Sequence, residues 1–475
     1  MTETLAGAVD QHARRRPDAP ALLWRDTVVT YRELAAGMRA TAAGVAELPA
    51  GPVGVRAKKS AAAVTFVLGC LAAGRTVVLP SPTLPNETLD LLCERAGAGA
   101  VVDETGLAPG TAKNVDLSEA DIPFMLTTSG STGVPKLVPL PAQGVEAFAR
   151  WVHDEFDVGP GRRVLNYAPL NFDLCLFEIW ATLRHGGCAV LVDPEIAADC
   201  DALLAFLERT RPHVVQAVPL FYQLLTEAAG GTHTLPPVAH VIFTGDAMNP
   251  HRLPPLEALF PNARFHNIYG CTETNDSFRY ELRPGDERRE SLPLGEPLPG
   301  VRADLVADGG ILTGPGVGEL VVRTPFQSPG YHDDTTGAFG PHPVPVDQER
   351  YFRSGDLVRR TESGEYFLEG RADFRVKVRG QQVYLQHVEE VLLAAEGVVE
   401  AAAVAVPDVH AGRRLHVVVR RREGSKLNSL VLRRYLSERL PPAAIPSTLH
   451  IGPEPLPRTS TGKVDRQYLV NSQIG

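Results

Sequence analysis

Short hydrophobic runs alternate with alanine- and leucine-rich stretches along most of the chain. Residues 76–79, 214–218 and 238–243 are rich in valine, and we predict that they are extended. Residues 61–71 and 203–207 have the composition of helices. Strands that alternate with helices in this way are typical of an α/β architecture built on buried, largely parallel sheet.

The first helix signal lies close to the N-terminus. Residues 27–30 form a β-branched run that predicts a short strand leading into a helix. Thr30 is followed three residues later by Glu33, which is the spacing of a capping box. We therefore expect the helix to begin directly after Thr30.

The pattern changes from Gly370 onward. Residues 371–379 form a basic, charge-rich strand, and a helix around residues 388–393 and a further strand at 417–419 follow. A segment of about a hundred residues has the usual size of a domain. We therefore predict two domains, residues 1–372 and 373–475: a large N-terminal domain of α/β layers and a smaller α+β domain.

The bulk composition narrows the classes of function. The 475 residues exceed what one hydrophobic core usually supports, and 47 basic against 56 acidic residues give a net charge of −9 without a long basic run. This argues against nucleic acid as a partner. No apolar stretch approaches the ~20 residues of a membrane span, and residues 1–11 lack the pattern of a signal peptide. Six scattered cysteines without zinc-ligand spacing favour a reduced, cytoplasmic setting.

One segment has the composition of a phosphate-binding loop. Residues 126–136 are dense in serine, threonine and glycine and end in Lys136. Backbone N–H groups and hydroxyls of such a loop can surround phosphate oxygens, and glycine permits a close approach. The loop lacks the Gly-Lys-Ser/Thr ending of a Walker motif, and a plain Ser/Gly linker would have a similar composition.

Four further segments follow the loop in a fixed order: residues 267–273, 351–357, 370–380 and 458–463. With the loop, they resemble the motifs of the superfamily of acyl-CoA synthetases, luciferases and nonribosomal peptide synthetase adenylation domains, and the similarity is greatest to freestanding amino-acid adenylating enzymes. The resemblance implies an enzyme that uses ATP and Mg²⁺ to convert a carboxylic acid into its acyl-AMP. It also implies release of pyrophosphate, transfer of the acyl group to a thiol, and a mobile C-terminal lid.

The same resemblance assigns nucleotide contacts to residues of these motifs. Thr272 would contact the α-phosphate, Glu273 would bind Mg²⁺ and Tyr269 would stack on adenine. Asp356, helped by Arg371, would accept hydrogen bonds from the ribose hydroxyls, a role that suits a carboxylate. The β- and γ-phosphates would be held by the loop residues Thr128, Ser129, Gly130, Ser131, Thr132, Gly133 and Lys136.

Two residues of the predicted C-terminal domain would serve the lid. By resemblance, Lys463 would bridge the substrate carboxylate and the α-phosphate in the transition state, as a preorganised charge. Asp373 stands at the position of the family's hinge, about which the C-terminal domain would rotate after adenylation. Without the resemblance, Lys463 would be a surface lysine and Asp373 an acid that caps a connecting strand.

Residues 170–180 resemble the Phe-Asp-x-x-x-x-Glu segment of amino-acid adenylation domains, in which the aspartate pairs with the substrate's ammonium group. A carboxylate at Asp173, beside Phe172 and Phe177, is costly unless a cation meets it, which favours an amino acid over a fatty or aryl acid. Alternatively, Asp173 caps the helix that follows. The resemblance places seven residues in the side-chain pocket: Leu174, Phe177, Ile242, Thr244, Ile268, Asp276 and Ser277.

Asp276 is unusual in a pocket for an apolar substrate. It would meet a second polar group or a displaced amino group, as in a β-amino acid, or it would face water. We therefore predict a small or polar amino acid, α- or β-amino, as the substrate. The alternatives are an aryl- or fatty-acid CoA ligase and a catalytically silent nucleotide-binding relative.

The acceptor is predicted to be a separate acyl or peptidyl carrier protein with a phosphopantetheine arm, because the chain ends soon after Lys463. Carriers are acidic, and Arg413, Arg414 and residues 420–422 offer basic groups, unless these form an ordinary solvated face.

Three positions differ from the family's sequence pattern. Residues 384–389 lack the Glu-Leu-Gly-Glu motif that the family has at the turn lining the pantetheine approach. Leu137 replaces a glycine and Cys271 a proline; Cys271 is not expected to act as a nucleophile.

Overall fold

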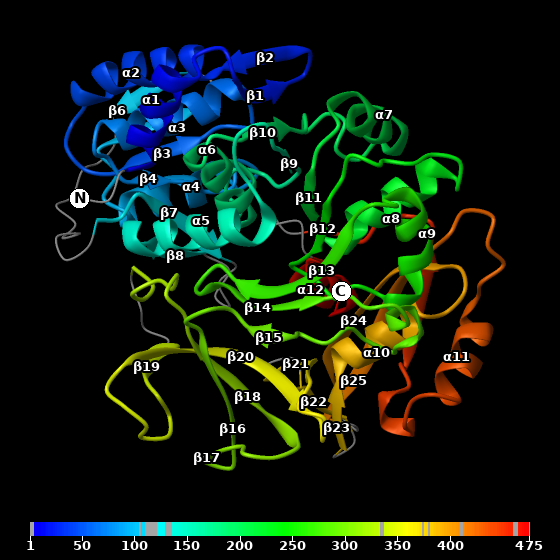
Figure 1. The fold of residues 1–475 in the computed structure, drawn as a ribbon. Helices are drawn as coiled ribbons and strands as arrows, with labels where there is room; N and C mark the ends of the chain where they lie inside the picture. Colours follow the sequence, from blue (N-terminus) through cyan, green and yellow to red (C-terminus); the bar gives the residue numbers. More distant parts are fainter. Residues whose placement is uncertain are drawn as a thin grey trace.

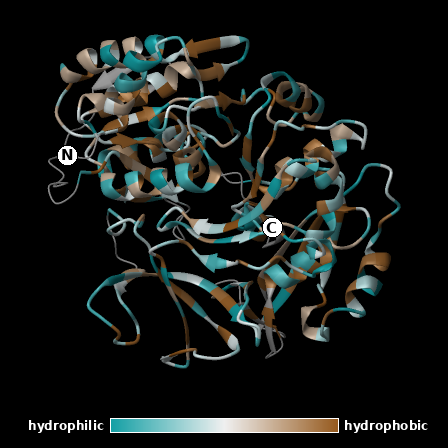
Figure 2. Ribbon diagram, in the orientation of Figure 1, coloured by the Kyte–Doolittle hydropathy of each residue, from teal (hydrophilic) through white to brown (hydrophobic). Residues whose placement is uncertain are grey.

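The computed structural model describes residues 4–103, 106–109, 121–128, 135–332, 337–372, 375–378, 381–408, 412–458 and 464–474. Two sheets with their helices form the upper part of the molecule in Figure 1, an antiparallel sheet lies below them, and the C-terminal segment lies at the right. The outer helices show alternating hydrophilic and hydrophobic turns in Figure 2. No helix of these described residues is long and apolar enough to cross a membrane.

A six-stranded sheet has the order β6-β5-β3-β4-β7-β8. Its inner strands pair in parallel, and β6 and β8 close the two edges in antiparallel fashion. Its strands are β3 (Val53–Arg56), β4 (Val77–Val78), β5 (Ala100–Asp103), β6 (Gly106–Pro109), β7 (Phe124–Thr128) and β8 (Lys136–Leu140). The helices of this region are α1 (Leu5–Arg15), α2 (Tyr31–Ala46), α3 (Ala61–Ala72) and α4 (Asn86–Arg95).

A nine-stranded sheet has the order β15-β14-β13-β12-β11-β9-β10-β1-β2 and is parallel from β13 to β1. Its strands are β1 (Pro20–Trp24), β2 (Thr27–Thr30), β9 (Arg163–Asn166), β10 (Cys188–Leu191), β11 (Val214–Ala217), β12 (His240–Phe243), β13 (Arg264–Cys271), β14 (Asn275–Glu281) and β15 (Glu296–Pro297). The accompanying helices are α5 (Ala142–Phe156), the π-helix η1 (Leu176–Ala181), α6 (Thr182–Arg184), α7 (Cys200–Thr210), α8 (Pro219–Ala229), η2 (Pro250–Arg252), α9 (Leu253–Leu259) and η3 (Asp286–Arg288).

A wholly antiparallel sheet follows, which the prediction of largely parallel sheet did not include. Its strands are β16 (Arg302–Ala307), β17 (Gly310–Ile311), β18 (Gly316–Arg323), β19 (Phe339–Pro341), β20 (Arg350–Arg360) and β21 (Tyr366–Arg371). Two residues with positive φ, Asp308 at 50° and Gly309 at 76°, connect β16 to β17. Such short turns join antiparallel neighbours, whereas parallel strands need long crossovers.

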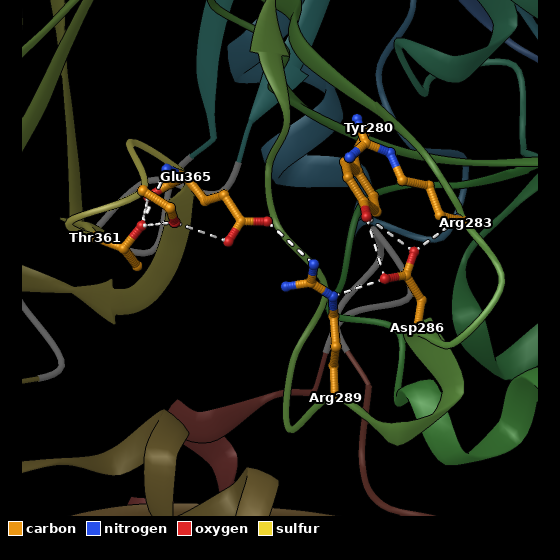
Figure 3. A network of polar contacts seen from close by, with 7 residues as sticks. Tyr280, Arg283, Asp286, Arg289, Thr361 and Glu365 are labelled. Atoms are coloured by element: carbon orange, nitrogen blue, oxygen red, sulfur yellow. Dashed lines mark hydrogen bonds and ion pairs between the residues drawn. The ribbon is translucent and has the colours of Figure 1, made fainter.

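A buried carboxylate connects this sheet to the nine-stranded one (Figure 3). Asp286 accepts hydrogen bonds from the Tyr280 hydroxyl at 2.9 Å and from Arg289 Nε at 2.6 Å. The same Arg289 guanidinium donates to Glu365, which lies in the turn between β20 and β21, at 3.1 Å. The two sheets are therefore joined by paired charges as well as by apolar packing.

The C-terminal segment has a hydrophobic core of its own, which includes Val388, Leu392, Val417 and Leu432. Its elements are β22 (Arg375–Val378), β23 (Gln381–Tyr384), α10 (Leu385–Leu393), β24 (Val398–Asp408), β25 (Gly412–Arg421), α11 (Ser429–Ser437), η5 (Pro442–Ala444), β26 (Thr448–Gly452) and α12 (Arg466–Ile474).

The predicted fold class is confirmed: large α/β layers precede a smaller α+β segment. The capping box is also present, because Glu33 N–H donates to Thr30 Oγ1 at 3.3 Å and Thr30 N–H donates to Glu33 Oε2 at 2.8 Å. The predicted helices and strands at α3, α7, α10, β11 and β12 lie where the hydrophobic pattern placed them.

Candidate active site

The ends of the predicted phosphate loop are held together by a β-hairpin. Strands β7 and β8 are antiparallel, and Thr128 lies directly opposite Lys136. A loop between these two residues therefore starts and ends at one place. Its residues Ser129, Gly130, Ser131, Thr132 and Gly133 lie outside the described residues.

An aromatic residue connects the loop lysine to the predicted metal ligand. The Lys136 ammonium lies over the ring of Tyr331, 4.3 Å from its centroid, which is cation–π geometry. The Tyr331 hydroxyl donates to Glu273 Oε1 at 2.7 Å. Lys136 and Glu273 are thus brought together through one side chain. Tyr331 was not predicted from the sequence, where the only signal for it is an aromatic side chain directly after Gly330.

Thr272 and Glu273 lie at the tip of the β13–β14 hairpin. Close to this tip, Gly270 pairs with Asp276 where the register shifts, and a Cβ atom at Gly270 would lie 2.4 Å from the Asn275 carbonyl oxygen. Asn275 has a φ of 57°, a left-handed conformation that asparagine tolerates better than most residues. The local sequence therefore fixes the direction in which this tip points.

The hairpin tip meets the predicted amine-binding aspartate. The Thr272 hydroxyl donates to Asp173 Oδ2 at 2.7 Å. Asp173 lies in the loop between β9 and η1 and is partly buried. The structure therefore places the residue predicted to face the α-phosphate in direct contact with the residue predicted to meet the substrate's amine.

The predicted ribose and adenine contacts also lie together. The Tyr269 hydroxyl donates a hydrogen bond to Asp356, and Arg371 Nη1 donates to the same carboxylate at 3.3 Å. Asp356 is in turn oriented by Ser354, whose hydroxyl accepts from the Asp356 backbone N–H at 3.0 Å. Burial, followed by the charge of Asp356, raises the pKa of Tyr269 well above its ordinary value, so its hydroxyl remains a donor.

The predicted pocket residues fall into an apolar group and a polar group. Phe177, Ile242 and Ile268 are buried in the main hydrophobic core, and Phe172 and Leu174 pack against it. Thr244 is 6% exposed. Ser277 is fully buried, and its hydroxyl donates to the Asn275 carbonyl oxygen at 3.3 Å, so it braces the hairpin.

Asp276 differs from these residues because its carboxyl group is hard to ionise. Burial, followed by the charge of Asp173, raises its pKa to about 8. The two carboxyl groups are therefore close enough to repel each other. A cation placed beside them would favour ionisation of both, which is the electrostatic requirement of an amine-binding site.

The predicted Mg²⁺ ligand, Glu273, is a single carboxylate. Among the described residues, there is no group of three His, Cys, Asp or Glu side chains that could hold a metal ion. Magnesium bound to a nucleotide takes only one or two protein carboxylates, because phosphates and water supply the other ligands. The single carboxylate of Glu273 is therefore sufficient.

Several other predictions have definite outcomes or lie beyond the described residues. Burial raises the pKa of the Cys271 thiol well above its ordinary value, which agrees with the expectation that it is not a nucleophile. Lys463 and Asp373 lie outside the described residues. Glu389, the last residue of the divergent segment 384–389, lies in helix α10, is buried and pairs with Arg466 at 2.6 Å.

The predicted basic face needs a correction. Arg420 pairs with Glu400 at 2.8 Å and also donates to the Pro453 carbonyl oxygen, while Arg421 donates to the Leu427 carbonyl oxygen. These two guanidinium groups stabilise the C-terminal segment itself, because β25 places them against neighbouring backbone. Arg413 and Arg414 are exposed.

Comparisons with known proteins identify relatives of this chain. A family model described as AMP-binding enzyme matches residues 9–118 and 104–332, and another, AMP-binding enzyme C-terminal domain, matches residues 387–463. A D-alanine–D-alanyl carrier protein ligase of Bacillus velezensis is 30% identical over 418 residues, which are 81% of this chain and 82% of the relative. A plipastatin synthase of Bacillus subtilis is 29% identical over 98% of this chain, which spans only 14% of that relative.

Solved structures show the same fold. A four-domain nonribosomal peptide synthetase bound to AMP and glycine aligns with a TM-score of 0.82 at 24% identity, over 98% of this chain and 36% of the other. The amide bond synthetase McbA from Marinactinospora thermotolerans aligns with a TM-score of 0.81 at 24% identity, over 98% and 99%. Together the fold and the sequence matches identify an AMP-forming ligase. The chain belongs to the AMP-binding enzyme family.

Proposed function

We propose that the protein activates a small or polar amino acid, α- or β-amino, as its aminoacyl-AMP and transfers it to the phosphopantetheine thiol of a carrier protein. The observation that carries this proposal is the 2.7 Å hydrogen bond between Thr272 and Asp173. It supports a site in which a carboxylate for the ammonium group would lie beside the position that the reacting phosphate would take. A ligase relative named for D-alanine and its carrier protein supports the same assignment.

In the adenylation step, the substrate carboxylate attacks the α-phosphorus of ATP and pyrophosphate leaves. Two anions must approach each other, so positive charge at the site lowers the barrier. Lys136 stands at the end of the phosphate loop to receive the β- and γ-phosphates, and Lys463 would bridge the carboxylate and the α-phosphate. Bound Mg²⁺, held by Glu273, would neutralise further phosphate charge.

The nucleotide would be fixed by three residues, of which Tyr269 and Arg371 each donate a hydrogen bond to Asp356. Asp356 would accept the ribose hydroxyls, with Arg371 beside it at 3.3 Å, and the ring of Tyr269 would face adenine. Ser129, Gly130, Ser131, Thr132 and Gly133 would wrap the leaving pyrophosphate, and Thr272 would contact the α-phosphate.

The substrate's ammonium group would pair with Asp173. This pairing favours ionisation of Asp173 and offsets its partial desolvation, a gain that a fatty or aryl acid cannot provide. Phe177, Ile242 and Ile268 would form the pocket wall and would favour a short side chain. Asp276 would accept a hydrogen bond from a second polar group or from a β-amino group.

Thioester formation would require the C-terminal domain to move. We assign residues 1–372 to the adenylation core and 373–475 to the lid, with Asp373 as the hinge. Rotation about this hinge would withdraw Lys463 and open the path for a thiol. Arg413 and Arg414, which are exposed on β25, would meet the acidic carrier.

Amino-acid-dependent exchange of pyrophosphate into ATP tests the proposal. The panel comprises alanine, serine, glycine and β-alanine. Benzoate and a medium-chain fatty acid serve as the comparison acids, because they have no amine. We expect exchange with at least one short amino acid and none with the amine-free acids. Exchange with benzoate or the fatty acid would favour a CoA ligase, and ATP binding without any exchange would indicate a silent relative.

A further inference from the structure

A buried lysine donates hydrogen bonds to the backbone just before the loop that carries Asp173. Lys59 lies between β3 and α3 and is 5% exposed. Its ammonium group donates to three consecutive carbonyl oxygens, those of Asn166 at 3.0 Å, Tyr167 at 2.9 Å and Ala168 at 3.1 Å. A lysine ammonium has three donors, so these three contacts use its full hydrogen-bonding capacity.

A buried carboxylate holds the same segment from another side. Glu178 lies in η1 and is fully buried. Its Oε2 accepts from Asn166 Nδ2 at 2.6 Å and from the Ala168 backbone N–H at 3.2 Å. Burial raises the pKa of Glu178 and lowers that of Lys59, and the charge of each group opposes the shift of the other.

Residues 166–168 continue directly into the loop that carries Asp173. The Pro169 carbonyl oxygen accepts from the Phe172 backbone N–H at 3.0 Å, and the Asp173 carbonyl oxygen accepts from the Leu176 N–H at 2.8 Å. Leu176 begins the π-helix η1, an uncommon conformation that is frequent at functional sites. The position of residues 166–168 therefore determines where this loop begins.

Stability alone gives a weak reason for two opposite charges at this place. Replacing buried ionic groups with apolar side chains of similar size is often neutral or stabilising, because their desolvation is costly. The three carbonyl groups, however, need a donor that apolar side chains do not provide. The arrangement thus defines the path of one particular backbone segment.

We propose that Lys59 is a positioning residue for amino-acid recognition, which acts by holding residues 166–168 so that the Asp173 carboxylate meets the substrate's ammonium group. This inference rests on the proposed function of Asp173. Lys59 would act only through this backbone segment, because its three donors are taken by the carbonyl oxygens of residues 166–168. Glu178 supports it by fixing the side chain of Asn166 and the N–H group of Ala168.

The test compares Lys59→Met with Lys58→Met. The control removes the same charge from the adjacent side chain, which is exposed. In pyrophosphate exchange, Lys59→Met should raise KM for the amino acid by about tenfold, while KM for ATP changes by less than about twofold. Lys58→Met should leave both values unchanged. An unchanged KM for the amino acid, or equal rises in both KM values, would overturn the proposal.

Hydrogen exchange separates this inference from the proposed function. Amide exchange across residues 166–176 should be faster in folded Lys59→Met than in Lys58→Met, with the nucleotide-binding strands unchanged. Equal protection of this segment would refute the positioning role whatever the substrate is. Absence of amino-acid-dependent exchange in the wild-type protein would instead refute the proposed function.

If Lys59→Met does not fold, Glu178→Gln takes its place, because it keeps the size of the side chain and removes its charge. It should show the same selective rise in KM for the amino acid. A uniform loss of kcat with both KM values unchanged would contradict the positioning role.

Discussion

The carboxyl group of Asp276 shows how the pocket alters the chemistry of a single residue. Burial and the neighbouring charge of Asp173 raise its pKa from the ordinary 3.8 to about 8. The folded protein therefore binds this proton more tightly than the unfolded chain does. The resulting stabilisation is complete below about pH 4 and is lost as the pH rises through about 8.

Asp276→Asn should accordingly stabilise the protein without ligand. Asparagine resembles the protonated acid and does not ionise, so its advantage in Tm over the wild type should grow from pH 4 to 8 and then level off. Thermal unfolding at several pH values provides the measurement. The control is Asp308→Asn, at an exposed turn position, which should show no such trend. An advantage that shrinks with rising pH would contradict the shifted pKa.

At the scale of elements, the β13–β14 hairpin aims Thr272 and Glu273 at the site. Gly270→Ala would introduce a Cβ atom 2.4 Å from the Asn275 carbonyl oxygen and 2.7 Å from Asp276 Cα. Because both contacts are with backbone, we expect a loss of about 2 kcal/mol in the free energy of unfolding, together with reduced exchange activity.

Chemical denaturation checks this prediction, and Gly314→Ala is the matched control. A Cβ atom at Gly314 would meet nothing within 4 Å, and the residue has no positive φ. Its free energy of unfolding should stay close to that of the wild type. Equal stability of the two variants would show that the hairpin does not need glycine at position 270.

Local sequence signals predicted the elements well where the cause of structure is itself local. The capping box at Thr30 and the valine-rich strands β11 and β12 depend on neighbours in the chain, and both were predicted. The antiparallel sheet from β16 to β21 was not, because short turns such as Asp308 and Gly309 have to be recognised before strand direction follows.

The candidate site also contains residues that the sequence predicted and residues that it did not. The motif residues Thr272, Glu273, Asp356 and Arg371 were predicted from resemblance. In the structure, Thr272 contacts Asp173, Glu273 contacts Tyr331, and Arg371 contacts Asp356. Tyr331 and Lys59 could not be predicted, because each acts through residues far away in the sequence. Their roles depend on tertiary contacts, for which a single sequence has no periodic or local signature.

At the scale of the whole molecule, the proposed mechanism needs the charge of Lys463, which belongs to the proposed C-terminal lid. Lys463→Ala should lower amino-acid-dependent exchange by about 100-fold or more, because a preorganised charge at the transition state is removed. ATP binding, measured by calorimetry, should remain within about threefold of the wild type, because the core residues hold the nucleotide.

Lys426→Ala is a suitable control, because Lys426 is an exposed lysine of the same domain. It should leave exchange and ATP binding unaltered. Wild-type exchange rates in Lys463→Ala would refute the assignment of the catalytic lysine and, with it, the proposed role of the lid.

Recognition of the substrate's amine by Asp173 is tested most directly by one ratio. This is kcat/KM for the best amino acid divided by kcat/KM for the same acid without its amine, compared in wild type and Asp173→Ala. The wild type should prefer the amino acid by about 100-fold or more, and the variant by less than about tenfold, because the group that pairs with the ammonium is gone. A preference that survives in Asp173→Ala would show that another group recognises the amine.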